Sequence, residues 1–150
     1  MGHTFTNHLY HICFSTKLRR ELITDSLKSP LYKNLCGIAR KTSGLILRIN
    51  GTKNHVHILA RVKPTMAVAV FIQKLKANSS KTINDSSPGP RLFQWQEGYA
   101  SFTVSDSIGE KVAAYIDRQE AHHRGRQYEE ELARLLEKHR IPFDRHEYLD

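Results

Sequence analysis

The chain has 150 residues, of which 39% are hydrophobic, and this length and composition predict one compact domain over residues 1–150. No apolar run approaches the roughly 20 residues that cross a bilayer, so we expect no membrane partner. The net charge of +8 is concentrated in residues 1–96, which hold 15 Lys and Arg against 3 Asp and Glu. This distribution favours a nucleic-acid partner, although a merely soluble basic protein explains it equally well.

The first predicted elements are a strand and a helix. Residues 4–15 alternate in polarity, which predicts a strand with one face in the core. Apolar residues then recur at helical spacing and Gly44 ends the helix; they are Leu31, Leu35, Ile38 and Ala39. No signal peptide precedes the strand, and Cys13 and Cys36 lack metal-ligand spacing, so we expect a cytoplasmic protein with reduced cysteines.

A β-hairpin and a second helix follow. Residues 45–49 and 55–62 are β-rich runs on either side of an Asn-Gly hairpin signal, so the two strands should pair antiparallel. The spacing of apolar residues predicts a helix over residues 68–83. Residues 84–90, Asn-Asp-Ser-Ser-Pro-Gly-Pro, predict a loop.

The remaining residues predict one strand and two helices. We expect a strand near the end of residues 92–104. Ser107 and Glu110 have the spacing of a capping box, which predicts the start of a helix, and Gly125 is expected to break it. Residues 128–139 then form an amphipathic helix.

The element order β-α-β-β-α-β, followed by two helices, predicts an α+β fold. We expect a ferredoxin-like or RNA-recognition-like sandwich, with an antiparallel sheet, helices on one face, and C-terminal helices that carry a tyrosine. Residues 1–104 would form the sheet-and-helix core, and residues 105–150 the tyrosine helix and C-terminal extension. In that extension we interpret Glu129, Glu130 and Glu131 as a solvated helix face, or as a rim that pairs with basic residues of a partner chain.

The segment His55-Val56-His57 is the first candidate site. Because side chains of a strand alternate between faces, both histidines point the same way and Val56 points into the core. Two neighbouring imidazoles can hold a divalent metal, although such a pair also occurs by chance and needs further ligands.

The helix that begins near Ser107 supplies a second candidate group. Tyr115 and Gln119 lie one turn apart on its apolar stripe. Alone, Tyr115 is interpreted as a packing aromatic. The amide of Gln119 needs a polar partner, however, and a metal held by His55 and His57 would supply one. A phenol aimed at phosphorus beside a divalent cation is the arrangement that phosphodiester cleavage by a tyrosine requires, and either Mg²⁺ or Mn²⁺ suits these ligands.

These motifs resemble those of single-tyrosine HUH transposases of the insertion-sequence 200/605 type. The similar segments are Asn54–Leu59 (Asn-His-Val-His-Ile-Leu), Lys74–Ser80, Trp95–Tyr99 and Tyr115–His123. They occur in the order and spacing of that family, and the resemblance runs nearly end to end.

The resemblance implies a mechanism and partners. Tyr115 would attack a DNA phosphate, form a 5′-phosphotyrosine link and release a 3′-OH, with His55, His57 and Gln119 as metal ligands. Such transposases act as homodimers on single-stranded DNA with hairpins near the element ends. The tyrosine helix serves either its own subunit or the partner.

Other residues would support this chemistry. Asn54 stands where the family often has Asp, so it could orient an imidazole without adding charge. His122 and His123 are interpreted as supporting residues near the tyrosine or as helix-end histidines. The candidates for DNA-phosphate contact, each of which could instead belong to a solvated basic face, are Lys53, Arg61, Lys74, Lys76, Lys81 and Arg91.

Two alternatives stay open. The chain could be a non-cleaving or domesticated module of the same fold that binds hairpin DNA or RNA. A small metal-dependent hydrolase is ranked last, because no carboxylate general base is evident beside the His pair.

Overall fold

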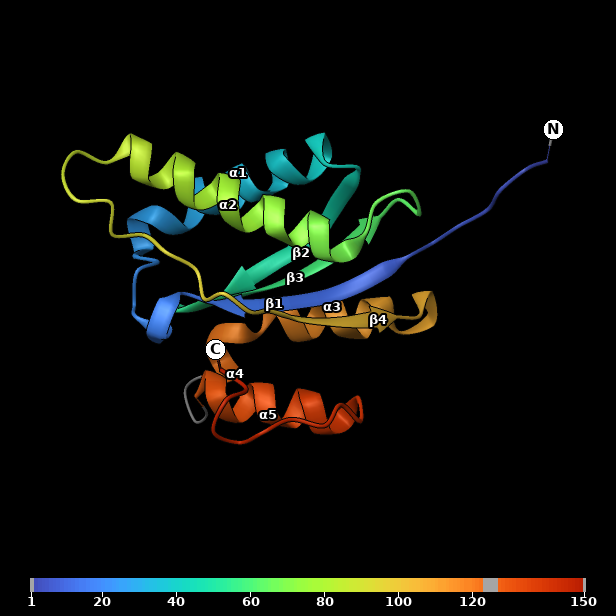
Figure 1. Ribbon diagram of the computed structural model, residues 1–150. Coiled ribbons are helices and arrows are strands. Elements are labelled where there is room, and N and C mark those ends of the chain that lie inside the picture. Colours follow the sequence, from blue (N-terminus) through green and yellow to red (C-terminus); the bar gives the residue numbers. More distant parts are fainter. Residues whose placement is uncertain (1, 123–126, 150) are drawn as a thin grey trace.

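The computed structural model describes residues 2–122 and 127–149, and in these ranges one four-stranded sheet carries helices on both of its faces (Figure 1). The strand order is β2-β3-β1-β4 and every neighbouring pair is antiparallel. The strands are β1 (Leu9–Ser15), β2 (Gly44–Gly51), β3 (His55–Val62) and β4 (Ala100–Val104).

The helices divide between the two faces of the sheet (Figure 1). Helices α1 (Asp25–Lys41) and α2 (Val68–Ser86) cover one face, and α3 (Gly109–Asp117) and α5 (Tyr128–Lys138) cover the other. The short helix α4 (Gln119–His122) joins the second group, and the single-turn helices η1 (Lys17–Arg19) and η2 (Asp106–Ile108) lie between larger elements. The predicted α+β fold and the order β-α-β-β-α-β are confirmed, and α3, α4 and α5 follow where two helices were predicted.

The main core lies between the sheet and helices α1 and α2. The even-numbered residues of β1 and β3 enter it, so Val56 is fully buried there as the alternation predicted. Helix α1 contributes Leu35 and helix α2 contributes Phe71 and Leu75. Gly44 allows this packing, because a Cβ at Gly44 would lie 2.5 Å from the ring of Phe71.

The opposite face of the sheet is also buried. Cys13 and Phe102 pack against Leu132 of α5, while Leu59 packs in a separate cluster with Ile116 of α3. His55 and His57 lie on this second face and are 0% exposed. The histidine pair therefore sits beneath helices and not on an open sheet surface.

The predicted start of the first strand and the predicted end of the second helix were wrong. The first strand begins at Leu9, and Phe5 before it is 91% exposed. Helix α2 continues through Ser86 into the expected loop. There the side chain of Asn84 exchanges hydrogen bonds with the backbone of Phe93, a tertiary contact that offsets the weak helix propensity of the segment.

The start and end of the tyrosine helix also differ from the prediction. Ser107 caps nothing and lies in η2, where its hydroxyl is 3.0 Å from that of Ser105. The helix ends at Asp117, and Gly125 lies outside the described residues. Asn50 of β2 donates a hydrogen bond to the Asp117 carbonyl at 3.2 Å, so a contact with the sheet satisfies a carbonyl at the break.

Crossing a bilayer would need a longer and more apolar helix than any found in residues 2–122 or 127–149.

Packing of α2 against the sheet should dominate stability. Leu75 is 0% exposed, so Leu75→Ala should lower the free energy of unfolding in urea by about 2–5 kcal/mol. Leu92 is 68% exposed, and Leu92→Ala should change it by less than about 0.5 kcal/mol. Similar losses in the two variants would contradict this account of the core.

Candidate active site

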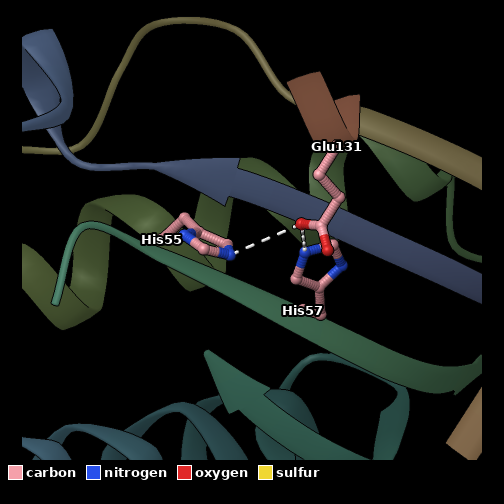
Figure 2. A group of neighbouring side chains, drawn as sticks. All are labelled: His55, His57 and Glu131. Carbon is pink, nitrogen blue, oxygen red and sulfur yellow. Dashed lines mark hydrogen bonds and ion pairs between the residues drawn. The ribbon is translucent and has the colours of Figure 1, made fainter. Parts of the chain in front are cut away.

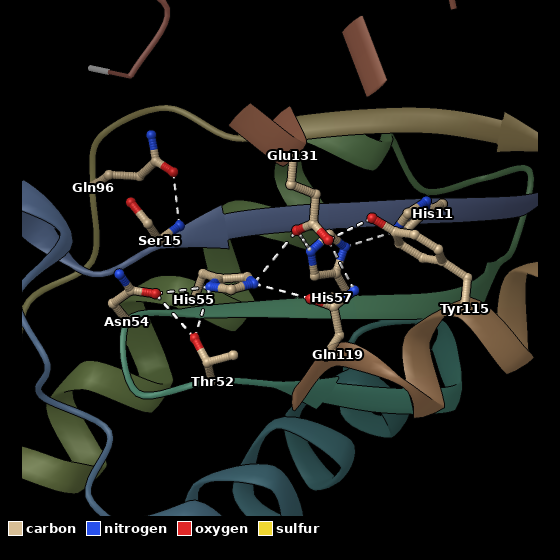
Figure 3. Close-up of polar contacts among 10 residues, drawn as sticks. All are labelled: His11, Ser15, Thr52, Asn54, His55, His57, Gln96, Tyr115, Gln119 and Glu131. Atoms are coloured by element: carbon tan, nitrogen blue, oxygen red, sulfur yellow. Dashed lines mark hydrogen bonds and ion pairs between the residues drawn. The ribbon is translucent and has the colours of Figure 1, made fainter. Parts of the chain in front are cut away.

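Five side chains from four elements converge on the second face of the sheet (Figure 3). His55 and His57 come from β3, Tyr115 from α3, Gln119 from α4 and Glu131 from α5. The structure thus brings together the four residues that the sequence singled out and adds a carboxylate.

Glu131 contacts both histidines of this group (Figure 2). Its Oε1 is 2.6 Å from His57 Nε2 and 3.6 Å from His55 Nε2, and the residue is only 2% exposed. For Glu131, the prediction of a solvated face or a partner-facing rim was wrong, as was the view that no carboxylate accompanies the histidines. Helical spacing could have predicted this burial, because Glu131 lies on the same buried face of α5 as Tyr128 and Leu132.

The second carboxylate oxygen of Glu131 connects the tyrosine to the histidines. Oε2 accepts a hydrogen bond from the Tyr115 hydroxyl at 2.5 Å and another from the Gln119 amide at 3.2 Å. Burial, followed by the charge of Glu131, raises the pKa of Tyr115 well above its usual range. The phenol is therefore protonated and directed toward the histidine pair.

Side chains on both sides of the ring contact the two nitrogens of His55 (Figure 3). Its Nδ1 is 2.8 Å from Asn54 Oδ1, an amide oxygen that can only accept, so Nδ1 donates. Burial lowers the pKa of His55 to about 4, so the ring is neutral at neutral pH. The lone pair of Nε2 then faces Gln119 Oε1 at 3.0 Å and Glu131 Oε1 at 3.6 Å.

This convergence of lone pairs fits a metal ion. An imidazole nitrogen, an amide oxygen and a carboxylate oxygen lie within a few ångströms of one another, and each is a group that binds divalent cations. The nearest nitrogen and oxygen atoms of His55, His57 and Glu131 lie within 4.8 Å of one another. Mixed nitrogen and oxygen ligands suit Mn²⁺ and are compatible with Mg²⁺.

His11 of β1 contacts the ring of His57 on the side away from Glu131. Its Nε2 lies 2.8 Å from His57 Nδ1, the ring atom turned away from Glu131. Burial, followed by the neighbouring His57, lowers the pKa of His11 to about 3. His11 was not predicted as a site residue, although strand alternation places it on the same face as Cys13, which pairs with His57.

Two sequence motifs outside the site pack against each other. Lys76 of α2 donates hydrogen bonds to the carbonyls of Glu97 and Gly98 at 2.9 and 2.8 Å. Trp95 donates from Nε1 to Ser79 Oγ at 2.9 Å and is 8% exposed. The similar segments 74–80 and 95–99 therefore form one structural unit against the sheet.

The remaining candidates differ in their surroundings. Lys53, Lys74 and Arg61 are exposed, while Lys81 and Arg91 both pair with Asp85 at 2.6 Å. Asn54 contacts His55 as described above. The prediction for His123 lies outside the described residues, and His122 is placed only as the end of α4.

Comparison with known proteins gives a consistent result. Residues 4–119 match the family model described as IS200-like transposase. The ISDra2 transposase TnpA of Deinococcus radiodurans is 25% identical over 117 residues, which span 73% of this chain and 82% of the relative. The transposase for insertion sequence element IS200 of Salmonella typhimurium is 28% identical over 125 residues, or 79% of this chain and 81% of the relative.

Solved structures share the fold. A transposase from Deinococcus radiodurans R1 has a TM-score of 0.63 at 23% identity and covers 79% of this chain and 96% of its own. A REP-associated tyrosine transposase bound to a REP hairpin has a TM-score of 0.62 at 11% identity, over 82% of this chain and 72% of its own. At these identities the likeness establishes the fold alone.

Burial of neutral histidines should make stability depend on pH. His55 and His11 have pKa values of about 4 and about 3 in the folded chain, against 6.5 for a free histidine. Below pH 6.5 the unfolded chain therefore binds protons that the folded chain does not. The free energy of unfolding should fall with pH, by up to about 1.4 kcal/mol per unit for each histidine.

Urea denaturation in EDTA between about pH 7 and about pH 5 measures this dependence. His11→Gln should flatten it, because that variant removes one of the buried histidines that take up a proton on unfolding. Stability that is unchanged across this range in the unsubstituted protein would contradict neutral, buried histidines.

Proposed function

This chain belongs to the family of IS200-like transposases, and we propose that it cleaves and rejoins single-stranded DNA with Tyr115 as the nucleophile. The observation that carries the proposal is the shared carboxylate. Glu131 joins the Tyr115 hydroxyl to His57 within one chain, so nucleophile and candidate metal ligands form a single cluster.

The proposed reaction exchanges a phosphodiester bond of the DNA for a phosphodiester bond to the tyrosine. The Tyr115 oxygen attacks phosphorus, the bond from phosphorus to the 3′ oxygen breaks, and the chain carries a 5′-phosphotyrosine. The phenol gives up its proton and the departing 3′ oxygen gains one. Attack by a 3′-OH on the phosphotyrosine reverses these changes and rejoins strands, so no external energy source is consumed.

The metal would be held by His55, His57 and Gln119, with Glu131 as a further oxygen donor. A divalent cation would neutralise charge on the phosphate oxygens. Asn54 and His11 would fix the ring orientations from the far nitrogens of His55 and His57. Since Glu131 Oε2 contacts the phenol, it must yield this position when phosphate approaches.

The proposed substrate is single-stranded DNA with a hairpin. A structural neighbour was solved with a REP hairpin, and the charge of residues 1–96 supports contact with phosphates. We place the activity in the cytoplasm and propose a homodimer. A partner is not needed to complete this cluster, so we propose that Tyr115 acts in its own subunit.

One observation favours a second candidate, a hairpin-binding module that does not cleave. His55, His57 and Gln119 are 0% exposed, so DNA cannot reach them while α5 stays in place. The two candidates differ in one product, the covalent protein–DNA adduct.

Tyr115→Phe should abolish that adduct and leave hairpin binding intact, because the substitution removes only the attacking oxygen. Protein incubated with hairpin-bearing single-stranded DNA and Mn²⁺ is analysed on denaturing gels. Tyr99, which is 42% exposed, provides the control, and Tyr99→Phe should give the unsubstituted yield. An adduct from the Tyr115 variant would remove this residue from its role, and none from the unsubstituted protein would support the non-cleaving module.

The metal assignment predicts a loss of binding. His55→Ala or His57→Ala should each weaken Mn²⁺ affinity by at least about tenfold in calorimetric titrations and reduce metal-dependent thermal stabilisation. The control is His146→Ala, since His146 is exposed. Unchanged affinity in both site variants would place the metal elsewhere.

A further inference from the structure

A cavity of about 510 Å³ opens directly beside the tyrosine. Residues from β4, α3 and the end of α5 form its walls, and Tyr115 and His11 are part of its lining. His11 in turn contacts His57 at 2.8 Å. Because His55 and His57 are themselves 0% exposed, this cavity is a place where the cluster meets accessible space.

The lining of the cavity combines apolar walls with positive charge. Ile108, Val112 and Leu135 supply apolar surface, and Lys111 and Lys138 are exposed lysines among its lining residues. No carboxylate occurs in this lining, so far as the described residues define it. The lining is thus more basic than the sequence around it, because residues 97–150 contain 12 Asp and Glu against 8 Lys and Arg.

An apolar slot edged by cations matches one part of a DNA strand. A nucleobase offers two flat faces for apolar and aromatic contact, and the phosphates on either side of its sugar carry negative charge. The ring of His139 adds a flat surface, since it lines the cavity and stacks on Phe102 at 4.2 Å between ring centroids. A peptide rich in acidic side chains would match the lysines but not the apolar walls.

We propose that this cavity binds the base of a nucleotide next to the scissile phosphate, with neighbouring phosphates on Lys111 and Lys138. The inference rests on the proposed function and deepens it by naming a substrate subsite. The pocket would hold the strand on the Tyr115 side of the cluster and restrict which nucleotides can lie there.

The test compares two fluorescein-labelled probes, a dT12 oligonucleotide and an abasic oligomer of the same length. Fluorescence anisotropy is measured on Tyr115→Phe protein, which cannot cleave. Loss of base stacking should weaken binding of the abasic probe by roughly fivefold or more. Lys111→Glu and Lys138→Glu should weaken both probes, whereas Lys33→Glu on α1 is a matched charge control that should have little effect.

A pocket-filling variant distinguishes the contribution of base binding from that of phosphate binding. Thr103 of β4 is exposed and lines the cavity, so Thr103→Trp should reduce dT12 binding to the abasic level while thermal unfolding remains cooperative. As a second measurement without pocket variants, a 5-iodouracil oligonucleotide should photo-crosslink to peptides that contain residues 103–115 or 135–139.

Equal binding of the dT12 and abasic probes by the Tyr115→Phe protein, or crosslinks only to other segments, would overturn the proposed subsite. These results are distinguishable from failure of the proposed function. A Tyr115 adduct with unaffected pocket variants would refute the subsite alone, whereas absence of any adduct from the unsubstituted protein would refute cleavage.

Discussion

The site depends on one buried negative charge. Glu131 is 2% exposed, and removing a carboxylate from water costs several kcal/mol unless partners compensate. Its oxygens accept hydrogen bonds from Tyr115 and Gln119 and contact His57, which offsets part of this cost. His55 and His11 are neutral at neutral pH and contribute no positive charge. A divalent cation at the histidine pair would compensate the negative charge of Glu131. We therefore infer that the same cation would stabilise the buried carboxylate and serve the proposed chemistry.

Because both faces of the sheet are covered by helices, the protein can bury a polar site without losing its apolar core. Helices α1 and α2 bury the main apolar core on one face, and the other face can therefore hold polar groups beneath α3 and α5. The two-residue period of β3 serves both purposes, because Val56 and Ile58 enter the core while His55 and His57 enter the site. Glu131 of α5 contacts both His57 of β3 and the Tyr115 hydroxyl, so under the proposed function it would lie where the substrate phosphate approaches the tyrosine. Helix α5 thus covers the site, and under the proposed function it would have to move for DNA to enter.

The parts that local patterns determine could be predicted from sequence. Strand alternation placed His55 and His57 on one face, and an amide on an apolar helical stripe marked Gln119 as a residue with a polar partner. Glu131 was missed because a run of three glutamates has the appearance of a solvated face, although its spacing from Tyr128 places it on the buried stripe. The helix break at Arg118 could not be predicted either, since it depends on a contact between Asn50 and the Asp117 carbonyl that forms only after folding.

The most direct test of the central claim is anomalous diffraction from crystals of the protein grown or soaked with Mn²⁺. The account predicts a single strong anomalous peak within coordination distance of His55 Nε2 and His57 Nε2, with oxygen ligands from Gln119 or Glu131. A fully occupied manganese bound elsewhere, with the histidine cluster unchanged and empty, would contradict it.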